Sequence, residues 1–341
     1  MGLSKKEERI LELINRDFVK DPKKPEFPPE HPRFPATPIY HINVPNFSNV
    51  WLKDESVNPT GTHKDRMAWE LVLAYRDMLL AKKHGIVKRT LPKMSIISSG
   101  SAANAIQTRF RKYEVPRLRV LVDIHIYSYI LEGLKKSGCL VYKTDLSKKS
   151  LGWKEILQLT HNLDGLDITS NEALDPTNKF YDWLSYEILN ENPEYVFIPF
   201  GTGHLYANIL NVSKKEISSH THPDGFKGDI RILRKCNFIG ATTNNPRSKA
   251  DKLYSHHSPF MHFNEQWRRY YQCCGFCGEK TDVLVIHEKF LDKAIELAEK
   301  QGITCEPSGI AGLALLMQIE KQIPKNKKII IVNTGKTKYL G

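Results

Sequence analysis

The chain has 341 residues, 40% of them hydrophobic and 26% charged, which excludes a single small module and a disordered chain and allows two lobes with a sizeable core. Its formal net charge is +12, because 50 Lys and Arg stand against 38 Asp and Glu. The basic residues are scattered and do not alternate with aromatic ones, so we expect no nucleic-acid partner.

Targeting signals are missing from the sequence. No stretch approaches the apolar length of a membrane span, and the charged N-terminal residues lack the apolar core of a signal peptide. The myristoylation pattern also fails, because Lys6 stands where Ser or Thr is required. We therefore expect a soluble cytoplasmic protein with no membrane partner.

The six cysteines do not predict a disulfide framework in a chain of this length. A single C-x-x-C pattern could begin a zinc site, but a second pair of ligands at readable spacing is absent. We therefore predict free thiols and no bound metal. The residues weighed for this site are Cys236, His256, His257, His262, Cys273, Cys274 and Cys277.

The chain begins with a predicted helix and a proline-rich arm. Ile10, Leu11 and Ile14 recur at helical spacing, and eight prolines lie between residues 21 and 45. Proline removes backbone donors, so we expect that stretch to lie extended over the body of the protein. We assign residues 1–37 to the helix and arm, 38–178 to an N-terminal lobe and 179–341 to a C-terminal lobe.

Strands and helices then alternate. Apolar, β-branched runs predict strands at residues 50–52, 95–99, 118–124, 139–144, 195–200, 283–286 and 328–333. Helical spacing predicts helices at 67–84, 127–137, 153–159, 180–189 and 288–300, and further helices that begin near 101, 204 and 309. Such alternation is typical of βαβ units and of parallel sheets covered on both faces. The polar stretch 213–281 is expected to be an irregular insertion.

One stretch, residues 51–66, has the strongest functional signal. The turn-forming residues 58–61, Asn-Pro-Thr-Gly, separate an apolar strand from a long helix and place Lys64 at the start of that helix. A helix N-terminus carries positive partial charge, so we expect the pKa of Lys64 to be lowered. A lysine of this kind can form an imine with a carbonyl compound.

Four further turns lie at predicted strand ends. Glycines that open a helix can close their amides on a phosphate, and hydroxyls beside free amides can bind a carboxylate. The phosphate-type turn lacks the Walker Lys-Ser pair and the full dinucleotide spacing, which makes ATP and NAD poor candidates. Because ligands bind outside the carboxyl ends of parallel strands, we expect all four turns to converge with Lys64 on one cleft. The turns are residues 98–101, 200–204, 306–309 and 333–335.

These motifs together resemble the pyridoxal-phosphate enzymes of fold type II, the tryptophan synthase β superfamily. Residues 52–55, Leu-Lys-Asp-Glu, and 58–66, Asn-Pro-Thr-Gly-Thr-His-Lys-Asp-Arg, are similar to the lysine motif of threonine synthases. The turn at 305–312 and the ending at 334–338 follow in family order, so the resemblance covers nearly the whole chain. It implies an α/β fold of two lobes, each with a mostly parallel twisted sheet flanked by helices, and an active site in the cleft between them.

The resemblance also implies roles for individual residues. Lys64 would bind pyridoxal 5'-phosphate covalently, and Thr334 would place a neutral hydroxyl at the pyridine nitrogen, which favours elimination over transamination. Two positions depart from the family pattern, because Ser101 replaces the usual Asn and His204 replaces a usual Gly. The residues expected to bind the cofactor are Lys64, His63, Ser101, Gly201, Thr202, Gly203, His204 and Thr334. Those expected to bind the substrate carboxylate are Ser98, Ser99, Gly100 and Ala102.

The function implied by the resemblance is that of a homodimeric lyase or transferase of amino-acid biosynthesis. We expect elimination or replacement at the β or γ carbon of an amino acid, first of all a threonine-synthase-like reaction on a phosphorylated or otherwise activated hydroxyamino acid. The alternatives are cysteine-synthase-like β-replacement and dehydration of serine or threonine. From another class, the chain could be a catalytically reduced binding or partner subunit with the same fold.

Overall fold

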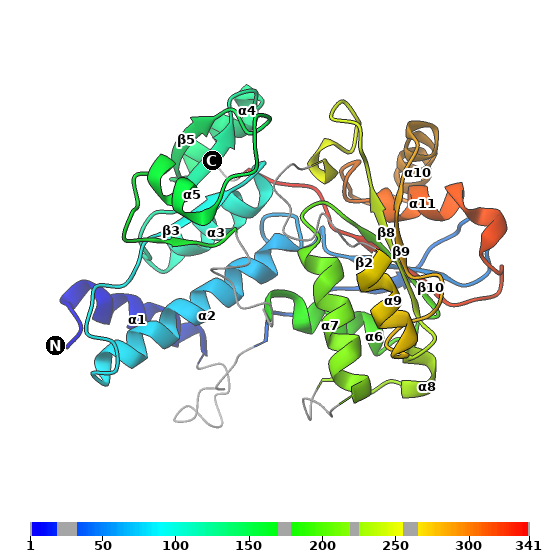
Figure 1. Cartoon of the computed structure of the whole chain (residues 1–341), viewed down its shortest axis with the longest axis horizontal. Coiled ribbons are helices and arrows are strands. Elements are labelled where there is room, and N and C mark those ends of the chain that lie inside the picture. Colours follow the sequence, from blue (N-terminus) through cyan, green and yellow to red (C-terminus); the bar gives the residue numbers. More distant parts are fainter. Residues whose placement is uncertain (1, 19–32, 170–178, 219–224, 255–264, 340–341) are drawn as a thin grey trace. The chain divides into compact units, whose positions relative to one another are not determined.

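The computed structural model divides the chain into two compact units, each made of segments far apart in the sequence (Figure 1). The structure describes residues 2–18, 33–169, 179–218, 225–254 and 265–339. Unit 1 consists of Met1–Pro35, Lys64–Pro176 and Lys338–Gly341. Unit 2 consists of Ala36–His63 and Thr177–Thr337.

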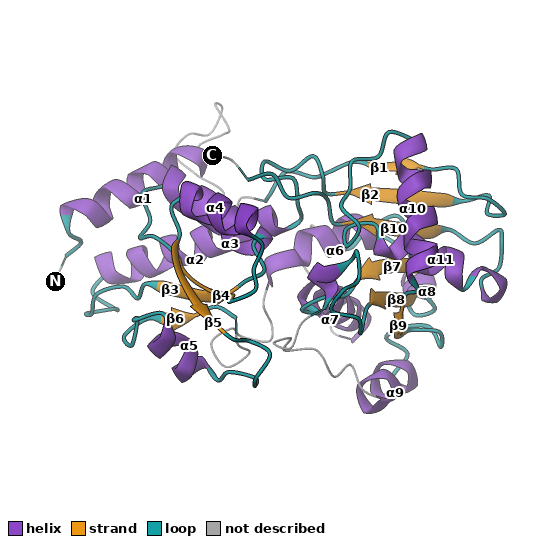
Figure 2. Ribbon diagram, turned by 90° about the horizontal axis from the view of Figure 1, so that it is seen from above, coloured by secondary structure: helices purple, strands orange, loops and turns teal. Residues whose placement is uncertain are grey.

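Unit 1 is built on a parallel sheet of four strands in the order β5-β4-β3-β6. The strands are β3 (Met94–Ile97), β4 (Arg119–Asp123), β5 (Leu140–Thr144) and β6 (Leu166–Asp167). The helices are α1 (Lys5–Phe18), α2 (Lys64–Lys83), α3 (Ser101–Lys112), α4 (Ser128–Ser137) and α5 (Trp153–Leu159). Figure 2 shows helices on both faces of this sheet, as expected where parallel strands are buried.

Unit 2 is built on a sheet of six strands in the order β1-β2-β10-β7-β8-β9, parallel except for β1. The strands are β1 (Ile39–His41), β2 (Val50–Asp54), β7 (Tyr195–Pro199), β8 (Asn237–Thr242), β9 (Asp282–Val285) and β10 (Ile329–Asn333). The helices are α6 (Asp182–Leu189), α7 (His204–Ser218), α8 (Ile230–Leu233), α9 (Glu265–Cys273), α10 (Glu288–Lys300) and α11 (Ala311–Gln318). Short 3-10 turns are η1 (Lys179–Tyr181), η2 (Asp251–Leu253) and η3 (Glu320–Gln322).

The core of unit 2 lies around its central strands. Every residue of β7 and of β10 is buried, and a run of apolar side chains without alternation is what a central parallel strand requires. The buried face of α11 and the apolar residues of α10 pack against this sheet. The α/β class and the parallel sheets predicted from the sequence are therefore confirmed.

Two sequence-based expectations differ from the structure, and a third concerns residues that the structure does not fully describe. Residues 38–63 lie in unit 2 rather than with α2, because β1 and β2 are strands of the larger sheet. The stretch 213–281 is not an irregular insertion, since it contains the inner strand β8 and the helix α9. Most of the proline-rich arm, residues 19–32, lies outside the described residues.

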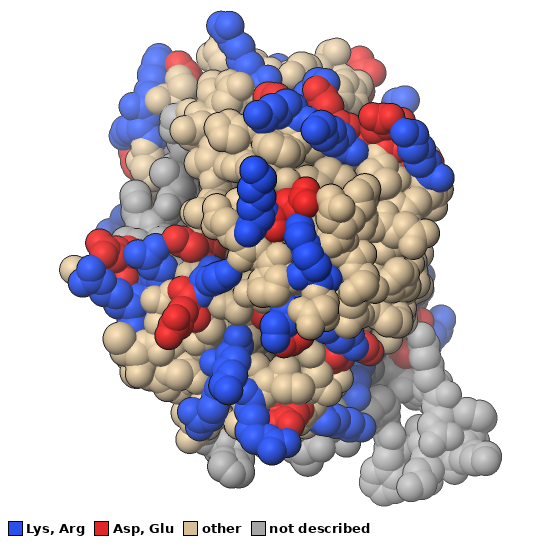
Figure 3. All heavy atoms as spheres, turned by 90° about the vertical axis from the view of Figure 1, so that its right-hand side faces the viewer, with Lys and Arg blue, Asp and Glu red and all other residues tan. Residues whose placement is uncertain are grey.

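The charged residues are spread over the surface. On the face drawn in Figure 3, Lys and Arg side chains occur at many places, some of them in small groups, with Asp and Glu among them. None of the helices in the described part of the chain is long and apolar enough to cross a membrane.

The cysteines are free thiols in the structure. Cys236 and Cys277 are buried, whereas Cys273 and Cys274 are exposed. The described residues contain no group of three side chains suited to hold a metal ion. The three histidines weighed for a zinc site, within residues 255–264, lie outside them.

Candidate functional site

Several predicted site segments lie at one edge of the larger sheet. Because β2, β10, β7, β8 and β9 run parallel, their carboxyl ends meet at the same edge. His63 follows β2, Thr334 follows β10, and the loop Gly201–His204 follows β7. This edge is where parallel sheets bind their ligands. Unit 2 therefore brings together these three segments as predicted from the sequence.

The turn before Lys64 is held by its own polar side chains. The amide of Gly61 donates to the carbonyl of Asn58 at 2.8 Å. The Asn58 Nδ2 donates to the Glu55 carboxylate at 2.8 Å and to the Thr62 carbonyl at 3.1 Å. Since Glu55 and Asn58 are both buried, these bonds fix the backbone that leads to Lys64.

Lys64 is the first residue of α2, as the sequence predicts. Burial lowers the pKa of Lys64 to about 8. The direction of the shift is the one expected, and the cause that accounts for it is the lost hydration of the ammonium group. With this pKa, a sizeable fraction of the amine is neutral and nucleophilic near neutral pH.

His63 connects the lysine segment to the end of the last strand. Its amide donates to the carbonyl of Thr334 at 3.2 Å, and its Nδ1 lies 3.4 Å from the same oxygen. The imidazole also packs on the ring of Tyr181, with centroids 5.3 Å apart. Because His63 immediately precedes Lys64, the position of Thr334 is tied to the backbone that carries the lysine.

Gly335 allows these two segments to approach closely. It has a φ of +98°, and a Cβ placed on it would lie 2.0 Å from the carbonyl oxygen of Gly61. The amide of Lys336 donates to that oxygen at 2.8 Å, and Thr62 forms an isolated bridge with Gly335. Only glycine fits at this position.

The loop after β7 has the features of a phosphate-binding turn. Gly203 has a φ of +79°, and His204 begins the 15-residue helix α7. The His204 Nδ1 lies 3.0 Å from the Thr202 hydroxyl. The backbone of η2 passes close to the loop, since a Cβ on Gly201 would lie 2.9 Å from the carbonyl oxygen of Lys252.

Lys252 is a charged residue near the site that the sequence analysis missed. Its Nζ lies 2.5 Å from the Glu306 carboxylate and donates to the Thr337 hydroxyl at 3.0 Å. Glu306 opens one of the four predicted turns, whose role the sequence left undefined. Lys252 belongs to no recognised motif, and it lies in the polar stretch that the sequence analysis interpreted as an insertion. The ion pair joins η2, the 306–309 turn and the chain after β10.

The predicted carboxylate turn lies in unit 1. The Ser98 hydroxyl accepts hydrogen bonds from the amides of Gly100 and Ala103, at 3.0 and 3.3 Å. Ser98 therefore accepts at the start of α3, and these two bonds do not use its own hydroxyl proton. Ser99 is exposed, and Ser101 and Ala102 are half-buried. Of the predicted site residues, Lys64 and residues 98–102 belong to unit 1 and all others belong to unit 2.

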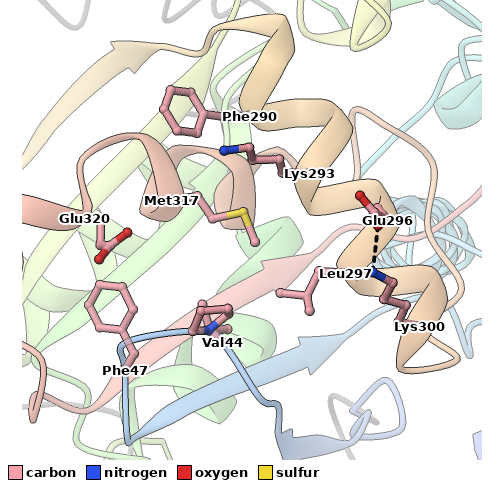
Figure 4. A pocket seen from close by; sticks show the side chains of 10 residues that line it. Val44, Phe47, Phe290, Lys293, Glu296, Leu297, Lys300, Met317 and Glu320 are labelled. Carbon is pink, nitrogen blue, oxygen red and sulfur yellow. Dashed lines mark hydrogen bonds and ion pairs between the residues drawn. The ribbon is translucent and has the colours of Figure 1, made fainter.

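A groove in unit 2 lies apart from these residues (Figure 4). Phe47, Phe290 and Met317 line it with apolar surface, while Lys300 bonds to Glu296 at its rim. None of its lining residues was predicted to be functional, and it offers no nucleophile or phosphate loop.

Replacing Gly335 by alanine should destabilise the protein by roughly 3 kcal/mol or more, because the new Cβ collides with the Gly61 backbone at a positive φ. The matched control is Gly302→Ala, where φ is +69° but no atom lies within 4 Å of the new Cβ. The control substitution should lower the free energy of unfolding by only about 1 kcal/mol. Urea unfolding of both variants measures the difference, and equal losses would contradict the close approach.

The comparisons with known proteins agree with this geometry. Residues 33–335 match the family described as pyridoxal-phosphate dependent enzyme. No curated protein sequence matches the chain. Among solved structures, O-ureido-L-serine synthase is similar with a TM-score of 0.63 and 17% identity, over 88% of this chain and 89% of its own.

Two other solved structures have the same fold. A hydrogen sulfide-producing enzyme from Fusobacterium nucleatum matches with a TM-score of 0.60 and 16% identity, over 99% of this chain and 100% of its own. The processed threonine deaminase isoform 2 of Solanum lycopersicum matches with a TM-score of 0.55 and 15% identity, over 86% of this chain and 80% of its own. At such identities the likeness shows the fold alone, but the family match spans most of the sequence, and the chain therefore belongs to the pyridoxal-phosphate dependent enzyme family.

Proposed function

We propose that the protein catalyses elimination or replacement at the β or γ carbon of an amino acid, with pyridoxal 5'-phosphate bound covalently to Lys64. The observation that carries this proposal is Lys64 itself. It begins α2 with a pKa lowered to about 8 by burial, and it follows a residue that is bonded to the end of β10. A neutral amine in this position suits both attachment to an aldehyde and transfer of a proton.

Three features of the loop 201–204 support its role in holding the cofactor phosphate. Its glycines allow a tight turn, since Gly203 has a φ of +79° and a side chain at Gly201 would meet the η2 backbone at 2.9 Å. The loop ends at the N-terminus of α7, where amides and the helix dipole favour negative charge. Thr202 and His204 add side-chain donors within the loop. The donor set therefore fits a phosphate group.

Thr334 is proposed to lie at the pyridine nitrogen, because its carbonyl is bonded to the amide of His63 beside Lys64. The acid of the neighbouring turn, Glu306, is bonded to Lys252 and Thr337. We propose that Ser99, Gly100 and Ala102 receive the substrate carboxylate at the start of α3 and that Ser101 contacts the cofactor. Ser98 is proposed to belong to the same carboxylate site, because its hydroxyl accepts from the turn and keeps its own proton to donate.

The cofactor, when bound, supplies an electron sink that stabilises negative charge at the substrate Cα. The remaining tasks fall to the chain. The amine of Lys64, released when the substrate amine takes its place on the cofactor, would take the proton from Cα and could return it later in the reaction. The turn before α3 would hold the carboxylate, and the loop after β7 would hold the phosphate.

We propose a hydroxyamino acid as the substrate, and first of all a phosphorylated or otherwise activated one, as in threonine synthases. The similar folds of a synthase of O-ureido-L-serine, a hydrogen sulfide-producing enzyme and a threonine deaminase support chemistry at the β carbon. Cysteine-synthase-like replacement and dehydration of serine or threonine remain the alternatives. We further propose that the protein is a homodimer. Size-exclusion chromatography with light scattering measures its mass in solution and tests this.

Replacing Lys64 by alanine should abolish covalent attachment of pyridoxal phosphate. Purified wild-type protein reduced with borohydride should gain the mass of one cofactor on the peptide that contains Lys64, and Lys64→Ala should gain none. Lys83→Ala, at the far end of the same helix, serves as the control and should retain the label. Labelling of the Lys64→Ala variant to the wild-type level would overturn the assignment.

Attachment of the cofactor should depend on pH in the way a lysine of pKa about 8 requires. The amine is protonated below this pKa and neutral above it, so the attachment rate should rise through pH 8 and level off by about pH 9. With an ordinary lysine, the attachment rate would keep rising up to about pH 10.4. Stopped-flow absorbance of cofactor-free protein mixed with pyridoxal phosphate, with Nα-acetyl-lysine as reference, gives both profiles.

A screen of possible substrates distinguishes elimination from replacement. Wild-type protein loaded with cofactor should change its visible spectrum with one or more of L-serine, L-threonine, O-acetyl-L-serine, O-phospho-L-serine and O-phospho-L-homoserine. Release of a 2-oxo acid indicates elimination, whereas a new amino acid formed with added sulfide indicates replacement. Loaded protein that responds to none of these compounds would refute the enzymatic proposal and favour a binding or partner subunit.

A further inference from the structure

The chain after β10 leaves the larger sheet and packs on unit 1. Lys338 and Tyr339 belong to unit 1, although Thr337 before them belongs to unit 2. The Asn104 Nδ2 donates a hydrogen bond to the Lys338 carbonyl at 2.8 Å. The ring of Tyr339 meets that of Tyr129 edge to face, with centroids 6.5 Å apart. These contacts hold the tail against α3 and α4.

Two glycines make room for the tyrosine. A Cβ on Gly133 would lie 2.6 to 3.0 Å from three carbon atoms of Tyr339, and a Cβ on Gly100 would lie 2.4 Å from its Oη. Gly100 also has a φ of +128°, which side chains rarely adopt. The hydroxyl of Tyr339 therefore lies directly beside the glycine of the proposed carboxylate turn.

This turn has fewer backbone donors to offer than its sequence implies. The amides of Gly100 and Ala103 are bonded to the Ser98 hydroxyl, so a carboxylate at the start of α3 depends on the remaining amides and on side chains. Tyr339 brings a hydroxyl to this place from the other end of the chain. A hydroxyl that donates to a carboxylate forms a short, strong hydrogen bond.

We infer that Tyr339 is a substrate-binding residue whose hydroxyl donates to the α-carboxylate of the amino acid held at residues 99–102. The inference rests on the proposed function and extends it, because it adds a residue to the substrate site and names the substrate group that the residue recognises. In the structure the Tyr339 hydroxyl is buried, so the inference requires the turn at residues 99–102 to admit the carboxylate next to it while the ring keeps its place on Gly133.

The test uses the cofactor-loaded protein and the variant Tyr339→Phe, which removes the hydroxyl and keeps the ring. Spectral titrations measure the apparent Kd of two pairs of ligands, L-serine with 2-aminoethanol and O-phospho-L-serine with O-phosphoethanolamine. Each amine lacks the carboxylate of its partner and is otherwise the same. Tyr127→Phe is the matched control, because Tyr127 stacks on Tyr129 with ring centroids 5.8 Å apart and immediately precedes α4.

Tyr339→Phe should raise the apparent Kd of the amino acid about tenfold, as expected for loss of a hydrogen bond to a charged group. It should leave the Kd of the matching amine within about twofold, and it should leave the cofactor spectrum and the melting temperature unchanged. Tyr127→Phe should change neither Kd.

Two results would overturn the inference and leave the proposed function intact. One is an unchanged Kd for the amino acid in Tyr339→Phe, and the other is an equal loss for amino acid and amine, which indicates a structural role. A wild-type protein that binds cofactor but responds to no amino acid would instead refute the proposed function, and the inference with it.

Discussion

The pairing of β2 with β10 is the constraint on which the candidate site depends. The two strands run parallel with Asp54 opposite Asn333, and the Asn333 Nδ2 donates to the Asp54 carboxylate at 3.0 Å and to the Thr304 carbonyl at 2.9 Å. Both strands are buried, so the register is fixed by packing as well as by hydrogen bonds. The chain segments that follow β2 and β10 therefore begin side by side at the same edge of the sheet.

The contacts beyond the strands continue the same alignment. His63 bonds to Thr334, Lys336 bonds to Gly61, and the 306–309 turn bonds to both Thr334 and Gly335. Lys252 adds an ion pair that includes the chain after β10. Polar side chains at this edge are therefore mostly engaged with the backbone or with one another, which preorganises the donors that a bound phosphate ester would use.

The sequence was sufficient for the features that depend on local chemistry. The turn at 58–61, Lys64 at a helix start and the glycine loop at 201–203 are short motifs whose conformations follow from proline, glycine and helix-end geometry. The strand β8 was missed because its pattern is weak: Gly240 replaces a side chain that would meet Val283 and Phe200 at 3.0 to 3.4 Å. The residues Lys252 and Tyr339 belong to no motif. Their positions follow from contacts with distant parts of the chain, which a single sequence does not reveal.

The place of β10 has a consequence for how the protein is made. β10 is the last strand of the described chain, yet it lies between β2 and β7 in the middle of the sheet. While the ribosome is still producing residues 200–328, β2 and β7 each have an edge with unpaired backbone groups, and such edges promote association between chains. Pairing over so long a sequence separation is also slow. The larger unit therefore completes its sheet only after residues 329–333 have been made.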